Sequence, residues 1–415
     1  MFSRRDLMAA TASGIVMTAA ASAQAATFGN PDLPPQGAIN AKGPNNLSDP
    51  GPQNPIIAGQ FPSSQLPPAT DVGGMALPWA TFNNAPRRIQ NGGWARQVTQ
   101  ADFAISTTIS GVNMRLTAGG IREMHWHQAG EWAIMTYGSC RVTVLDNQGR
   151  PYVADVNAGD LWYFPSGAPH SLQGLGPDGC EFVICFDDGQ ANEFNTLLLS
   201  DWIAHTPPEI LAKNFGVPVE SFAKIPLQNL WIFQGTVPGA LAADQASSYR
   251  DADVAPYPFT YSLGSSKPVK STRNGEIRIA DTSNFTASAT IAVALVTVKP
   301  GGMREMHWHP NADEWQYYLA GRARMTLFNS GPNATTIDFT SGDVGYVKRN
   351  FGHYIENTGD TDLQFIEVFR TAHYEEVSLS DWLTHTPPAL VAQHLNVAPE
   401  VIAKWPRRAP GIMPA

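Results

Sequence analysis

The chain has 415 residues, 43% of them hydrophobic, which is enough for two medium-sized domains with buried cores. Its 36 glycines and 33 prolines favour many turns and short strands, so the predicted fold class is mainly β. The formal net charge of −9 argues against nucleic acid as a partner, and it requires local cations to attract any anionic substrate. The three cysteines are too few for a disulfide framework.

Residues 1–25 are predicted to form an export signal. A charged start, SRRDLM at residues 3–8, precedes an uncharged alanine-rich run and the small residues Ala23-Gln24-Ala25, with cleavage expected after Ala25. The arginine pair resembles a twin-arginine signal, and a general secretory signal is the alternative. No later segment is long and apolar enough to span a membrane. We therefore expect an exported protein, periplasmic or extracellular, without stable membrane association after cleavage.

Beyond an arm, the chain repeats itself. Residues 26–75 are dense in proline, glycine, asparagine and serine, which predicts an extended arm. The sequence His125-Trp126-His127 recurs as His307-Trp308-His309, an offset of about 180 residues that other segments share. The repeat predicts two tandem domains, over residues 76–245 and 246–415.

The pattern inside each repeat is strand-like. Residues 294–298 and 323–328 alternate or run apolar with strand-forming side chains, and glycines separate such runs. After Asp201-Trp202 and its copy Asp381-Trp382, a proline pair precedes a run of helix formers. Two β-rich domains with short helical appendages are therefore predicted.

Each repeat also carries a set of metal-binding side chains. A His-x-His pair on a strand presents both imidazoles on one face, and a glutamate and a third histidine follow each pair. Three imidazoles and one carboxylate suit a borderline or hard divalent metal and leave coordination positions open for a substrate. Structural zinc is not expected, because no thiolate joins the pattern. The two predicted sets are His125, His127, Glu131 and His170, and His307, His309, Glu314 and His353.

The spacing of these residues is similar to the two cupin motifs. The first repeat has Gly119 to Gly138 and Gly159 to His170, and the second has Gly302 to Gly321 and Gly342 to Asn357. Among cupins, the chain resembles the bicupin oxalate decarboxylases over nearly everything after the arm. The segments that carry this likeness are 122–127, 159–165, 314–318 and 342–347. The resemblance implies two cupin domains of the double-stranded β-helix, or jelly-roll, type.

One segment departs from the family pattern. Lys348-Arg349-Asn350 stands where a Pro-x-Gly sequence is usual, so the turn before His353 is expected to differ and to bring two cations near the second site.

The resemblance also implies an activity and a set of catalytic residues. It implies Mn²⁺ at both sites, two ions per chain, with oxalate as substrate, formate and carbon dioxide as products, and dioxygen required but not consumed. Arg122 and Arg304 match the arginines that hold a substrate carboxylate. Glu193, placed by gapless alignment to Asp201-Trp202, matches a general acid on a short lid. Glu367 and Tyr374 match an acid and a tyrosine of the second domain.

Other functions remain open from the sequence. An oxalate oxidase, which makes hydrogen peroxide in place of formate, uses the same scaffold and would lack the acid at Glu193. A non-catalytic bicupin, for storage or carbohydrate binding, would lose metal ligands that this chain retains. A dioxygenase is a third alternative. The sequence does not decide which site turns over, or whether the chain forms a homo-oligomer.

Overall fold

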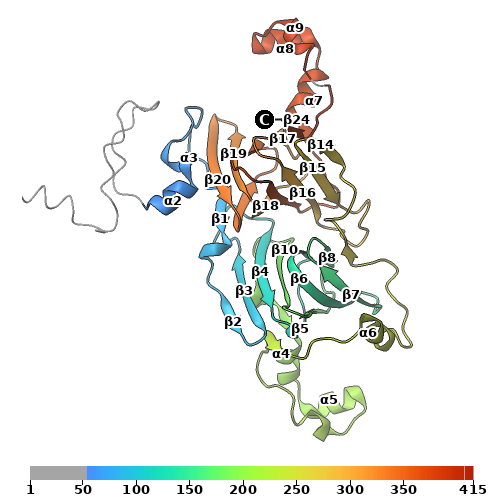
Figure 1. Cartoon of the computed structure of the whole chain (residues 1–415). Coiled ribbons are helices and arrows are strands. Elements are labelled where there is room, and N and C mark those ends of the chain that lie inside the picture. The colour runs from blue at the N-terminus through green and yellow to red at the C-terminus, as the bar shows by residue number, and fades with distance from the viewer. Residues whose placement is uncertain (1–53, 406, 415) are drawn as a thin grey trace, which may run out of the picture. The chain divides into compact units, whose positions relative to one another are not determined.

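The computed structural model describes residues 54–405 and 407–414, and the chain divides into two units, residues 1–71 and 72–415 (Figure 1). The predicted export signal lies outside the described residues. In the first unit the arm departs from the predicted extended form at residues 55–65, which form helices α2 (Pro55–Gln60) and α3 (Pro62–Gln65). Both begin with a proline in their first turn, and the Asn54 side chain accepts hydrogen bonds from the first free amides of α2. Among the described residues, no helix could cross a bilayer.

The second unit is mainly β, as predicted, and the strands of its two repeats pair antiparallel (Figure 1). The strands of the first repeat are β1 (Trp79–Thr81), β2 (Arg88–Gln90), β3 (Gly93–Val98), β4 (Ser110–Leu116), β5 (Gly120–Trp126), β6 (Glu131–Leu145), β7 (Pro151–Asn157), β8 (Leu161–Phe164), β9 (His170–Gly174), β10 (Cys180–Phe186), β11 (Leu197–Leu198) and β12 (Ile232–Gln234). Those of the second are β13 (Thr260–Tyr261), β14 (Lys270–Thr272), β15 (Gly275–Ala280), β16 (Ala292–Val298), β17 (Met303–Trp308), β18 (Glu314–Ala320), β19 (Arg322–Asn329), β20 (Asn333–Thr340), β21 (Asp343–Val347), β22 (Gly352–Asn357), β23 (Leu363–Phe369), β24 (Val377–Ser378) and β25 (Ile412–Met413).

Strand β6 joins the two faces of the first repeat. Its first residues pair with β8 and β10, and its later residues pair with β7 and β9. The change of partner falls at Gly138, which has φ of 65° and whose missing Cβ would lie 2.0 Å from the Gly179 carbonyl oxygen. Only glycine fits there. In the second repeat the equivalent strand is divided at Gly321 into β18 and β19.

The two repeats exchange their first strands. β1 pairs with β21 of the second repeat, and β13 pairs with β8 of the first. One buried apolar cluster includes Trp132 and Trp162 from the first repeat and Trp315 and Tyr346 from the second. The sheets therefore do not follow the sequence boundaries at residues 245 and 246, because each repeat completes the other's sheet.

The predicted helical appendages are present. Helices α4 (Leu199–Ala204) and α5 (Pro208–Phe215) follow β11, and α7 (Leu379–Thr384), α8 (Pro388–Leu395) and α9 (Pro399–Ile402) follow β24, while α6 (Leu241–Ser248) links the repeats. A proline starts α5 and α8. The left-handed residues Gly216 and Asn396 end them.

Candidate metal centres and their surroundings

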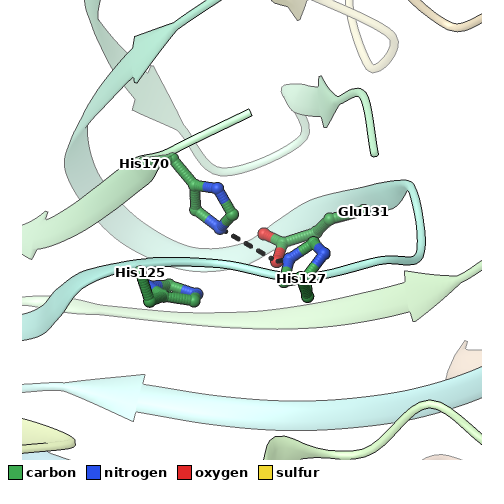
Figure 2. A group of neighbouring side chains, drawn as sticks. All are labelled: His125, His127, Glu131 and His170. Atoms are coloured by element: carbon green, nitrogen blue, oxygen red, sulfur yellow. Dashed lines mark hydrogen bonds and ion pairs between the residues drawn. The ribbon is translucent and has the colours of Figure 1, made fainter. Parts of the chain in front are cut away.

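The first cluster gathers at the ends of three neighbouring strands. His125 lies near the end of β5 and His127 just beyond it, Glu131 begins β6, and His170 begins β9 (Figure 2). The two histidines of the His-x-His pair face the same side, while Trp126 between them packs edge-on against Trp202 at 5.5 Å. All four side chains are buried, and one ligating atom of each lies within 4.8 Å of the others.

The second cluster repeats this geometry. His307 and His309 come from the end of β17, Glu314 begins β18, and His353 lies in β22. These residues are also buried, and their ligating atoms lie within 4.8 Å of one another. The eight side chains that the sequence predicted as ligands are thus brought together in the two predicted sets.

Every imidazole of the two clusters has its Nδ1 atom committed to the main chain. The six Nδ1 atoms lie 2.6 to 3.1 Å from the carbonyl oxygens of Glu123, Ala129, Ala168, Glu305, Glu375 and Phe351. Because a carbonyl only accepts, Nδ1 carries the proton and the Nε2 lone pair is directed to the cluster. The Nε2 atoms of His170, His307, His309 and His353 are buried without a hydrogen-bond partner. A cation would satisfy these lone pairs, so the residues fit a bound metal ion.

Electrostatics favour the metal-binding protonation state at both glutamates and at His125, His170 and His307, whereas the Glu314 carboxylate outweighs burial and raises the pKa of His309. Burial and the neighbouring cationic groups lower the pKa values of His125 and His307 well below the usual range, so both rings are neutral. Burial alone would raise the pKa of Glu131, but the His170 and His127 rings lower it well below its usual range. His353 and His309 lower the pKa of Glu314 in the same way. Neutral imidazoles and an ionised carboxylate are the forms that bind metal.

The predicted arginine and acid of the first repeat lie beside the first cluster. Arg122 is buried in β5, and Glu193 is buried at the start of the short helix η2 (Glu193–Asn195). A cavity of about 10 Å³ is lined by Arg122, Glu193 and the ligands His125 and Glu131. The guanidinium of Arg122 lies 5.4 Å from the centre of the Trp231 ring, and its Nη1 donates to the Trp231 carbonyl at 3.4 Å.

The two asparagines that flank Glu193 have a structural role. Asn192 accepts hydrogen bonds from the amides of Phe194 and Asn195, and the Asn195 side chain accepts one from the Asn192 amide at 3.1 Å. This reciprocal capping box closes the turn that carries Glu193. The carboxylate of Glu193 pairs with Arg88 of β2, a residue that the sequence analysis did not single out.

The second cluster has a different ionic environment. Arg304 is fully buried and is bonded to Glu376, to the Tyr374 hydroxyl at 2.9 Å and to Glu367 at 3.4 Å. Burial raises the pKa of Glu367 to about 7. Lys270 of β14 forms a further ion pair with Glu376.

Glu376 and Lys270 were also missed, and the repeat could have indicated the lysine. The number of residues from Arg88 to Lys270 equals that from His125 to His307, so a cation recurs at the same place in both repeats.

The expectation of a different turn before His353 is wrong. Asn350 takes the left-handed conformation, φ 69°, that Gly167 takes in the first repeat, φ 78°. The two amides donate to His309 and His127 carbonyls at 3.0 and 2.9 Å. Asparagine tolerates this conformation better than other side chains, so the turn survives without glycine. Lys348 does not place a free cation at the cluster, because its Nζ pairs with Asp313 at 3.1 Å and with Thr107 of the first repeat at 2.6 Å.

Comparisons with known proteins agree with this architecture. A family model described as Cupin matches residues 80–221 and 261–403. Oxalate decarboxylase OxdC of Bacillus subtilis is 48% identical over 338 residues, covering 81% of this chain and 87% of that protein. A probable oxalate decarboxylase of Arthroderma benhamiae is 40% identical over 376 residues, 88% of each chain.

Solved structures give the same result. The structure of oxalate decarboxylase from Bacillus subtilis at pH 4.6 superposes with a TM-score of 0.86 at 44% identity, covering 90% of this chain and 97% of that one. Another structure of that enzyme, from a study of its Mn(II) centres, has a TM-score of 0.87 and covers 92% of this chain. Two jelly-roll repeats that each assemble three histidines and a glutamate define a bicupin of the metal-binding type. Within that class, the chain belongs to the oxalate decarboxylase family.

Proposed function

We propose that this protein is a manganese-dependent oxalate decarboxylase. It converts oxalate and one proton into formate and carbon dioxide, and it requires dioxygen without consuming it. The observation that carries the proposal is the cavity where the buried carboxyl of Glu193 meets Arg122 and the ligands of the first cluster. An acid beside the reacting carbon is what separates formate formation from further oxidation.

Manganese is the proposed metal at both sites, two ions per chain. The residues that would hold it are His125, His127, Glu131 and His170, and His307, His309, Glu314 and His353. Nitrogen and carboxylate ligands without thiolate suit this ion. When bound, it supplies a Lewis acid and a one-electron relay for cleavage of the carbon–carbon bond. A structure of the related oxalate decarboxylase from Bacillus subtilis comes from a study of its Mn(II) centres, which supports this choice.

Arg122 is the proposed oxalate-binding cation. The net charge of −9 repels a dianion, so binding depends on a local cation that is not already neutralised. Arg122 contacts a main-chain carbonyl and an aromatic face and forms no ion pair with the described residues, although the charges of Glu193 and Glu131 act on it from a greater distance. Its fork of N–H donors matches a carboxylate.

Glu193 is the proposed general acid. After carbon dioxide leaves, it gives a proton to the remaining carbon, and formate is released. The cavity of about 10 Å³ is about large enough for one water molecule and too small for oxalate. We therefore propose that residues 192–196 move away to admit the substrate and return before the proton is transferred.

Arg304, Glu367 and Tyr374 are proposed to act mainly as an ionic network that supports the second site. Arg304 already meets four partners, two of them carboxylates, so substrate would have to displace one of these. Glu367 is the next candidate for the acid if Glu193 is not required.

The test is to identify the products. Purified protein loaded with manganese is given oxalate in air, and formate, carbon dioxide and hydrogen peroxide are quantified together. A decarboxylase gives formate and carbon dioxide in equal amounts with little peroxide. Two equivalents of carbon dioxide with peroxide would identify an oxidase, and no consumption of oxalate would identify a non-catalytic bicupin.

We further propose that the chain is exported through its first 25 residues. The paired arginines at positions 4 and 5 support twin-arginine export. Replacing both with lysine should retain the protein inside the cell, and sequencing the exported protein should find a start at residue 26. Export of the double-lysine variant would favour the general secretory route.

A further inference from the structure

We propose that Arg88 is a positioning residue for the lid acid: it holds Glu193 at the cavity by an ion pair and is itself fixed on the ring of Trp231. The inference rests on the proposed function of the first site, and it adds a residue that neither the ligand set nor the cupin motifs include.

Arg88 is the more exposed member of an ion pair with Glu193. Its side chain is 21% exposed, whereas that of Glu193 is 5% exposed, and the two form an ion pair although 105 residues separate them. A buried carboxylate is costly unless a cation compensates it. The ion pair therefore favours the lid conformation in which Glu193 lies against the cavity. When Glu193 carries its proton, the Arg88 guanidinium still donates to the other carboxyl oxygen, so the contact holds the acid in both protonation states.

Arg88 is held in place by the segment before β12. Its guanidinium lies 4.9 Å from the centre of the Trp231 ring and also donates to the Gln90 side-chain oxygen. Gln90 bridges to the same segment, because its Oε1 accepts from the Ile232 amide at 3.1 Å and its Nε2 donates to the Leu230 carbonyl at 3.4 Å. The cation thus has a defined position before Glu193 arrives.

Trp231 connects this arrangement to the substrate-binding arginine. Its ring faces both Arg88 and Arg122, and it meets the lid side chain Phe194 edge-on at 5.8 Å. Its backbone has φ of 53°, which is unusual for a bulky residue. The Trp231 amide donates to Glu123 at 3.0 Å and its carbonyl accepts from the Glu123 amide at 3.0 Å, so the strained conformation is held from both sides.

These contacts give Arg88 a role separate from that of Arg122. Arg122 lines the cavity and would bind the substrate, whereas Arg88 is not among the residues that line it. Arg88 acts on the position of the acid. Misplacing the acid slows protonation and leaves more time for oxidation, so the ratio of formate to peroxide is the informative readout.

The experiment compares Arg88→Gln, Arg88→Lys and the neighbouring control Arg87→Gln in the manganese-loaded full-length protein. Arg87 is exposed and stacks on Trp94 instead. Arg88→Gln should lower kcat for formate by about 10-fold or more and raise the share of peroxide, with KM for oxalate and manganese content unchanged. Arg88→Lys should recover part of the loss, and Arg87→Gln should behave as the wild type.

A double variant tests whether Arg88 works through Glu193. In the Glu193→Gln background, Arg88→Gln should have little additional effect, because the group that it positions is already removed. Additive losses, a wild-type product ratio in Arg88→Gln, or a raised KM at unchanged kcat would each overturn the proposal. If Arg88→Gln fails to fold, Arg88→Met removes the same charge, and a wild-type product ratio and rate in that variant would equally overturn the proposal. A wild type that makes no formate would refute the proposed function instead.

Discussion

The two metal clusters share their ligands and differ in what surrounds their arginines. Arg122 meets a carbonyl and an aromatic ring, and the nearby acid Glu193 is paired with a different cation. Arg304 is paired directly with Glu376 and Glu367. The two repeats therefore share a ligand set but not the surroundings of the arginine, since Arg304 forms ion pairs with two glutamates and Arg122 forms none with the residues that the structure describes.

The difference can be followed to one position. Thr196 and Glu376 each stand three residues before the leucine that starts the following helix, α4 or α7. In the second repeat a carboxylate at this position reaches Arg304, and Lys270 stabilises it. In the first repeat a threonine stands there and lines the cavity, while the carboxylate is three residues earlier, at Glu193. Glu193 thus lines the cavity beside Arg122 and pairs with Arg88 instead.

Removing the glutamate ligand from each site in turn should give the largest difference in activity between the two repeats. Glu131→Ala is expected to lose manganese from the first site and nearly all formate production, because the ligand is buried and central to its cluster. Glu314→Ala should lose the second ion and retain much of the activity. Metal analysis should find about two manganese ions per chain in the wild type and about one in each variant. Equal loss of activity in both variants would mean that both sites turn over or that the second metal holds the fold.

Removing the acid from each site should give the next largest effect. Glu193→Gln keeps the size of the side chain and deletes its proton, so formate production should fall by about 100-fold or more while manganese stays bound and some flux moves to peroxide. Glu367→Gln should retain most of the activity. Near wild-type formate from Glu193→Gln, with a large loss in Glu367→Gln, would move the catalytic site to the second repeat.

Replacing each arginine with lysine should separate a substrate-binding role of Arg122 from a structural role of Arg304. Arg122→Lys should lower turnover by about 10-fold or more with metal content intact, because a point charge does not replace the bidentate fork. Arg304→Lys should instead lower the unfolding temperature, since it leaves buried carboxylates with a poorer partner. Loss of metal from Arg122→Lys would show that this residue maintains the structure of the cluster.

The pH dependence of stability should report the buried acid of the second site. Since burial raises the pKa of Glu367 to about 7, the folded metal-free protein keeps a proton there that the unfolded chain loses near its ordinary pKa of 4.5. Stability is thus lost as pH rises between these values. Glu367→Gln does not ionise, so its unfolding temperature should rise relative to that of the wild type from pH 4.5 to 7. A constant difference would mean that Glu367 is already ionised in the folded state.

The smallest expected effect concerns the two equivalent turns. Asn350→Gly should change stability little, whereas Asn350→Ala and Gly167→Ala should each cost about 1 kcal/mol, because alanine is strained at positive φ. A Cβ at Gly167 would meet no atom within 4 Å, so the stability lost in Gly167→Ala comes from the backbone conformation alone. Denaturant unfolding measures the difference. Equal stability of Asn350→Ala and the wild type would show that the turn relaxes to another conformation.

The fold class, the helical appendages and the eight grouped candidate ligands could all be predicted from the amino-acid sequence. Side chains alternate along a strand, so both histidines of a His-x-His pair lie on the same side, and the repeat contains this pattern twice. These features therefore depend on local geometry. The sequence also placed Glu193 by its distance from Asp201-Trp202, because no insertion separates them. The prediction for the turn before His353 was wrong because asparagine, like glycine, can adopt the left-handed conformation that this turn requires.

The ion pairs between charged side chains could not be predicted from the sequence and are known only from the tertiary structure. The exchange of β1 and β13, the pairing of Arg88 with Glu193, and the saturation of Arg304 by Glu376 and Glu367 join residues far apart in the chain. Sequence patterns record which face of a strand a side chain occupies, but not which strand from another part of the chain lies opposite. Whether a buried arginine is free for substrate depends on that opposing strand, since ion pairing falls off within a few ångströms.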